Sequence, residues 1–87
     1  MSQTAEDSRL TLYTTVWCGS CVRLKAQLKR ENIAFTEVDI EADPGAANIV
    51  AAANNGMHLV PTVVLANGIA LGNPPISAIK SHLSANA

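Results

Sequence analysis

The sequence is poor in aromatic residues, since its 87 positions include only one Trp, one Tyr and one Phe. Aromatic side chains bury large areas in most protein cores, so their scarcity excludes a core built around rings. Hydrophobic residues nevertheless make up 48% of the chain. We therefore expect one small domain with a core of small aliphatic groups and without a large ligand cavity.

An excess of charge of either sign is also absent. Six Lys and Arg residues stand against seven Asp and Glu residues, without a basic stripe, which argues against nucleic acid as a partner. No apolar run approaches the roughly 20 residues that span a bilayer, so no membrane partner is expected. The opening MSQTAEDSR is polar and acidic, unlike a secretory signal. We predict a cytoplasmic monomer, in a compartment that keeps thiols reduced.

Hydrophobic patterning divides the chain into a flexible tail, residues 1–9, and a single domain, residues 10–84. The predicted strands are residues 10–15, 34–40, 62–66 and 69–71. The predicted helices are residues 19–32, which Asn32 ends, 46–53, which follow an N-cap at Asp43 with Pro44 at the first helical position, and 75–83. The closing SANA is expected to fray. The order β-α-β-α-β-β-α predicts an α/β fold in which a four-stranded mixed sheet has helices on both faces.

The first predicted helix has the clearest hydrophobic period in the chain. Cys21, Leu24 and Leu28 follow one another at spacings that place them on one helix face. We expect this face to be buried, and we expect Val22 and Ala26 to widen it.

Only two cysteines are present, Cys18 and Cys21. A disulfide that closes a loop of about four residues stabilises a fold by only ~2 kcal/mol, which disfavours a structural role. A tetrahedral zinc site needs four ligands, and His58 and His82 lack the close spacing of zinc-finger histidines. We therefore predict no metal centre within one chain, and a cluster shared between two chains stays open as an alternative.

A reactive pair accounts better for the position of these cysteines. Cys18 directly precedes the first turn of the predicted helix, where unpaired backbone N–H groups and the helix dipole favour a thiolate. Cys21 faces inward, so it is expected to stay protonated and to act as the resolving partner. Gly19 and Ser20 are small, which lets a substrate approach the Cys18 sulfur. Cys-x-x-Cys at a strand-helix junction of a cytosolic βαβ chain is typical of redox sites.

Three segments resemble the glutaredoxin branch of the thioredoxin fold: YTTVWCGSCVRLK, the pair Val60-Pro61 before TVVLANG, and LGNPP. Within this branch the sequence is most similar to the mycoredoxins, small oxidoreductases that work with mycothiol, over residues 10–83. The resemblance implies a thioredoxin-like fold and a thiol-disulfide oxidoreductase. It also implies that Cys18 attacks, that Cys21 can resolve, and that a cis Val60-Pro61 bond exposes the Val60 backbone to an extended substrate.

The resemblance further implies where the small thiol binds. The places that hold the charged ends of glutathione in other relatives carry His58, Gly72 and Asn73 here. A neutral imidazole and an amide suit a sugar-bearing thiol, so mycothiol, or else glutathione, is the expected co-substrate, with no tightly bound cofactor. Beside these, Trp17 is expected to form a partly exposed platform next to the nucleophile, and Lys25 is a candidate for attracting an anionic thiol.

The predicted reaction is the reduction of mixed disulfides between proteins and mycothiol, so the expected partners are mycothiolated proteins or peroxidases. One alternative is a thioredoxin-like reductase that uses both cysteines and is recharged by thioredoxin reductase. A second alternative is a non-catalytic carrier of a metal or an iron-sulfur cluster.

Overall fold

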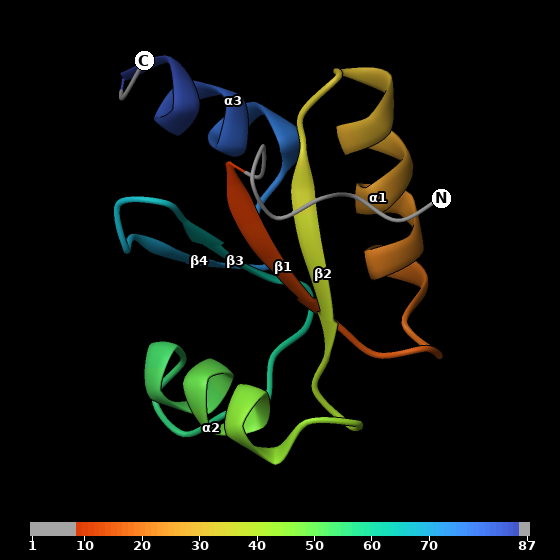
Figure 1. The fold of residues 1–87 in the computed structure, drawn as a ribbon, viewed down its shortest axis with the longest axis vertical. Helices are drawn as coiled ribbons and strands as arrows, with labels where there is room; N and C mark the ends of the chain where they lie inside the picture. Colours follow the sequence, from red (N-terminus) through yellow and green to blue (C-terminus); the bar gives the residue numbers. More distant parts are fainter. Residues whose placement is uncertain (1–8, 86–87) are drawn as a thin grey trace.

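The computed structural model describes residues 9–85, and it contains the predicted strands and helices in the predicted order (Figure 1). The elements are β1 (Leu10–Thr14), α1 (Gly19–Arg30), β2 (Phe35–Asp39), α2 (Pro44–Ala53), β3 (Thr62–Leu65), β4 (Ala70–Gly72) and α3 (Ile76–Ala85). Residues 1–8 of the predicted tail lie outside the described residues. Arg9 is described, and its backbone N–H donates to the Ala34 carbonyl at 3.0 Å.

The four strands form one mixed sheet, as predicted, and their order in the sheet is β2-β1-β3-β4. β1 and β2 are parallel, whereas β1 and β3, and also β3 and β4, are antiparallel. Tyr13 of β1 lies opposite Thr62 of β3. Because these two strands run in opposite directions, the loop that leaves β1 and the loop that enters β3 meet at the same edge of the sheet. That edge holds both cysteines on one side and Val60-Pro61 on the other.

Helices cover both faces of the sheet, as predicted (Figure 1). Side chains of α1 and α3 pack on one face in the larger core cluster, which consists of Leu10, Leu12, Leu24, Leu28, Phe35, Val63, Leu65, Ile79 and Leu83. The smaller cluster joins α2 to the other face through Tyr13, Ile40, Ala46 and Val50. Burial of one such aliphatic side chain contributes about 1.5–3 kcal/mol, so both clusters fix the sheet edge that carries the cysteines.

The ends of the helices follow the sequence signals. Asp43 caps α2, and its carboxylate accepts from the Gly45 and Ala46 amides at 3.0 and 3.3 Å. Asn32 follows α1 in the left-handed region at φ 59°, which Asn tolerates better than most residues. Within residues 9–85 no helix is long and apolar enough to cross a membrane.

Two local predictions are wrong. Val22 is 58% exposed and Ala26 is also exposed, so neither widens the buried face of α1. The buried stripe of α1 consists of Cys21, Leu24 and Leu28 only, because Val22 beside it lines the open hollow between α1 and β2. The closing SANA, residues 84–87, was expected to fray, but Ser84 and Ala85 belong to α3. Residues 86–87 lie outside the described residues.

Candidate active site

Cys18 lies at the N-terminus of α1, in the N-cap position, with an extended backbone (φ −88°, ψ 110°). Its Sγ accepts a hydrogen bond from the Cys21 amide at 3.1 Å. An N-cap side chain normally satisfies a free N–H in this way through oxygen, and here the sulfur takes that place. The N–H donor and the positive end of the helix dipole both stabilise negative charge on Sγ.

Cys21 lies in a different environment, since it is only 1% exposed and faces the core from α1. Burial, together with a hydrogen bond and the charge of Cys18, raises the pKa of Cys21 from 9.0 to about 12, whereas a backbone hydrogen bond from Thr15 opposes the rise. Glu37 adds a smaller contribution in the raising direction. Both cysteines are free in the structure, and Cys21 is therefore a neutral thiol at neutral pH.

Val60 and Pro61 lie opposite Cys18 at the end of the sheet that carries the cysteines. The peptide bond between them is cis, as the resemblance implied. The Val60 carbonyl accepts from Cys18 Sγ at 4.0 Å, and within residues 9–85 no hydrogen bond from the Val60 amide is present. The Val60 amide is therefore a backbone donor beside Cys18 that can pair with an extended chain.

An open groove of about 380 Å³ lies between α1, the start of β3 and the start of α3. It is lined by Ser20, Arg23, Leu24, Gln27, Pro61, Asn73, Pro74, Pro75 and Ile76. Ser20, Pro61 and Asn73 were predicted from the sequence, and the structure brings all three together. Gln27 was missed, and Lys25 was preferred to Arg23 as the cation for an anionic thiol, although Ser20, Arg23 and Gln27 recur at i, i+3 and i+7 as one polar stripe of the helix.

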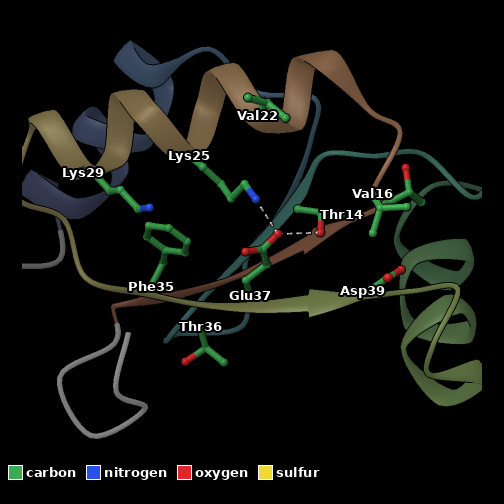
Figure 2. A pocket seen from close by; sticks show the side chains of 10 residues that line it. Thr14, Val16, Val22, Lys25, Lys29, Phe35, Thr36, Glu37 and Asp39 are labelled. Carbon is green, nitrogen blue, oxygen red and sulfur yellow. Dashed lines mark hydrogen bonds and ion pairs between the residues drawn. The ribbon is translucent and has the colours of Figure 1, made fainter. Parts of the chain in front are cut away.

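A second hollow, of about 490 Å³, lies on the other side of α1, between this helix and the edge strand β2 (Figure 2). Lys25 lies here, away from the groove, and its Nζ forms an ion pair with Glu37 Oε2 at 3.0 Å. Thr14 donates to the same Glu37 oxygen at 2.9 Å. An anionic thiol would therefore compete with Glu37 for the Lys25 ammonium group. The predicted role of Lys25 in attracting such a thiol stays a prediction.

Trp17 directly precedes Cys18 in the chain and is 70% exposed. Its indole N–H donates to Glu41 Oε2 at 3.1 Å, from the loop between β2 and α2. On the other side of Cys18, a Cβ added at Gly19 would have no neighbour within 4 Å. Cys18 itself is only 8% exposed, between an exposed Trp and a glycine with free space around it, and the role of Trp17 as a platform stays a prediction.

The remaining predicted residues lie on the loops around β3. His58 is exposed in the segment before Val60. Gly72 permits close packing, because a Cβ there would lie 2.5 Å from Asn54 Oδ1 and 2.8 Å from a Leu59 methyl group. Their predicted contacts with a thiol stay predictions. Among the described residues no group of three or more His, Cys, Asp or Glu is placed to hold a metal ion.

A thioredoxin fold with a Cys-x-x-Cys pair at the start of α1 defines the class, and solved structures agree. The thioredoxin-like protein BC3987 superposes with a TM-score of 0.72 at 29% identity, over 83% of this chain and 96% of that one. The glutaredoxin grx-1 of Archaeoglobus fulgidus gives 0.70 at 23% identity, over 85% and 84% of the two chains.

Sequence comparison gives the family. The glutaredoxin family model matches residues 10–68. "Putative glutaredoxin Rv3198A" of Mycobacterium tuberculosis is 49% identical over 74 residues, 85% of this chain and 88% of its own length. Mycoredoxin 1 of Corynebacterium glutamicum is 30% identical over 80 residues, 92% and 99% of the two chains. The chain belongs to the glutaredoxin family and is a thiol-disulfide oxidoreductase, as predicted.

Proposed function

We propose that the protein reduces mixed disulfides between proteins and mycothiol. The Cys18 thiolate attacks the sulfur of the small thiol, a new disulfide forms between Cys18 and that thiol, and the protein leaves as a thiolate that takes up a proton. A second mycothiol then attacks the small-thiol sulfur on Cys18, which releases the low-molecular-weight disulfide and restores Cys18. The observation that carries this proposal is the Cys18 sulfur in the N-cap of α1, a helix whose residues Ser20, Arg23 and Gln27 line an open groove.

The lining of the groove favours a sugar-bearing thiol. Ser20, Gln27 and Asn73 offer a hydroxyl and two amides, and Arg23 is the single charged side chain among the lining residues. Hydroxyl and amide groups can both donate and accept hydrogen bonds, which matches the hydroxyl groups of a sugar. The similarity to a protein named Mycoredoxin 1 points in the same direction. We place mycothiol in this groove, with mycothiolated proteins or peroxidases as partners of a cytoplasmic monomer.

A kinetic comparison of two thiols tests this proposal. The substrate is one protein carried as a mixed disulfide with either mycothiol or glutathione, and the matching free thiol is the electron donor. We expect kcat/KM to be at least about tenfold higher for the mycothiol pair, equivalent to ~1.4 kcal/mol of selectivity. An equal or higher value for the glutathione pair would assign the groove to glutathione instead.

A second candidate function is a dithiol reductase of protein disulfides, recharged by thioredoxin reductase. The likeness to the thioredoxin-like protein BC3987 favours it, and so does the hydrogen bond between the Cys21 amide and Cys18 Sγ, which keeps the two residues in contact. Insulin reduction with NADPH and thioredoxin reductase separates the two candidates. Turnover there that exceeds turnover with mycothiol would favour the dithiol route.

A further inference from the structure

A buried chain of polar groups lies beneath the loop that presents Val60. The hydroxyl of Thr62, a residue with 0% exposure, donates to the Leu59 carbonyl at 2.6 Å. The same hydroxyl accepts from Asn54 Nδ2 at 3.2 Å. A buried hydroxyl that both donates and accepts has a fixed direction. The Thr62 hydroxyl therefore fixes the position of the Leu59 carbonyl, which directly precedes Val60.

Asn54 connects this hydroxyl to the end of α2. Its Nδ2 also donates to the Val50 carbonyl at 2.8 Å, within the last turn of the helix. Its backbone carbonyl accepts from the Met57 amide at 3.1 Å, where the presenting loop begins. Val50 is itself fully buried in the core cluster beneath α2. The loop is thus tied through one side chain to a rigid helix and its core.

The opposite side of the loop is tied to the segment after β4. The Asn73 amide donates to the Pro61 carbonyl at 2.7 Å. Gly72 lies against Asn54, because a Cβ at this position would meet Asn54 Oδ1 at 2.5 Å. The carbonyls of Leu59 and Pro61 both accept hydrogen bonds, whereas the amide of Val60 between them has no hydrogen-bond partner among the described residues.

We propose that Asn54, acting through Thr62, is a positioning residue that sets how tightly the Val60 backbone pairs with a disulfide substrate. This inference rests on the proposed function. The side chain of Asn54 contacts neither cysteine; it fixes the Thr62 hydroxyl, which fixes the Leu59 carbonyl and so the orientation of the next peptide. A backbone held in its pairing geometry loses less conformational entropy when the substrate binds, so the effect appears in KM.

The test uses two matched pairs of variants. Asn54→Asp removes the amide donor, and the introduced carboxylate competes with the Leu59 carbonyl for the Thr62 proton. Asn55→Asp adds the same charge at the adjacent exposed position, whose left-handed backbone (φ 56°) Asp tolerates. Thr62→Val removes the hydroxyl at nearly constant volume, and Thr62→Ser restores it.

Two quantities are measured for each variant. The first is KM for the reduction of a peptide that forms a mixed disulfide with mycothiol, and the second is the rate of Cys18 alkylation by iodoacetamide. We expect Asn54→Asp and Thr62→Val to raise KM for the peptide by about five- to tenfold, the effect of about one hydrogen bond. The alkylation rate should stay within about twofold, because iodoacetamide does not pair with the Val60 backbone. Asn55→Asp and Thr62→Ser should keep both values.

Each other outcome overturns the inference. A KM within twofold of the wild type in folded Asn54→Asp and Thr62→Val would show that the polar chain does not act on substrate binding. A parallel fall in alkylation would place its effect on Cys18 itself, and failure of both variants to fold would make the two groups structural. If the wild type does not reduce the peptide mixed disulfide, the proposed function fails first; if it does, these variants test positioning alone.

Discussion

The two cysteines lie three positions apart at the start of α1 and both are buried, yet their sulfurs have different environments. Cys18 is outside the first turn, with an N–H pointing at its sulfur, whereas Cys21 is one turn further and is enclosed by the core. Three residues advance a helix by nearly a full turn, so Cys21 remains close to Cys18 but inside the protein. The comparison teaches that two residues of the same type acquire different environments from their positions relative to a helix end.

The largest expected difference is in turnover. Cys18→Ser should reduce mixed-disulfide reduction to the uncatalysed rate, because a hydroxyl does not replace the attacking thiolate. Cys21→Ser should keep activity within about tenfold of the wild type, since the second thiol can come from mycothiol. Steady-state assays with the mycothiol mixed disulfide measure both. Loss of activity in both variants would mean that Cys21 is required and that the dithiol route operates.

Alkylation should separate the two sulfurs next. With the pKa of Cys21 raised to about 12 from 9.0, its thiolate fraction at pH 7 is about a thousandfold lower than that of an ordinary cysteine. Mass spectrometry of the reduced protein after iodoacetamide treatment should therefore find the label on Cys18 long before Cys21. Labelling of Cys21 at the rate of a free cysteine would contradict the buried environment described for it.

The sequence predicts much of this contrast because it depends on local signals. The helix period placed Cys21 inward with Leu24, and the strand-helix junction placed Cys18 at a helix start. What could not be predicted depends on contacts between distant segments: Arg23 lines the groove only because the loops before β3 and α3 meet α1, and Glu41 reaches Trp17 across 24 positions. Such contacts follow from strand order and register, which hydrophobic periodicity does not specify.

The contact between Asn54 and Thr62 is another contact between distant segments that could not be predicted from the sequence. Thr62 lies in the predicted strand 62–66, and Asn54 directly follows the predicted helix 46–53; both elements are present in the structure. Their hydrogen bond, however, joins the end of α2 to the start of β3. No spacing rule links these positions, because the connection depends on how the intervening loop turns.

Stability should also depend on the Cys21 proton. The folded protein holds this proton more tightly than the unfolded chain, so the stabilisation is fully present below pH 9 and is lost as pH rises toward 12. A displacement from 9.0 to about 12 sets an upper limit of ~4 kcal/mol on the loss. Denaturant unfolding of the reduced protein between pH 8 and pH 11 measures it. Cys21→Ala lacks this proton, so its free energy of unfolding should fall less steeply over the same range.

The smallest effect concerns Glu37, whose negative charge is the least of the causes that raise the pKa of Cys21. Glu37→Gln removes that charge, so it should increase the alkylation rate of Cys21 by less than about tenfold, a modest electrostatic change near the surface. Glu31→Gln is the matched control, because Glu31 also forms a 3.0 Å ion pair, with Lys80, far from the cysteines along α1.

Salt gives the last test of this small effect. Glu37 is partly exposed, so its influence on Cys21 should weaken as ionic strength rises and the screening length falls from about 10 Å at 0.1 M toward 3 Å at 1 M. At high salt the alkylation rates of the wild type and Glu37→Gln should converge. A difference that persists at 1 M salt would mean that Glu37 acts on Cys21 by packing or by hydrogen bonds, because only its long-range charge effect is screened.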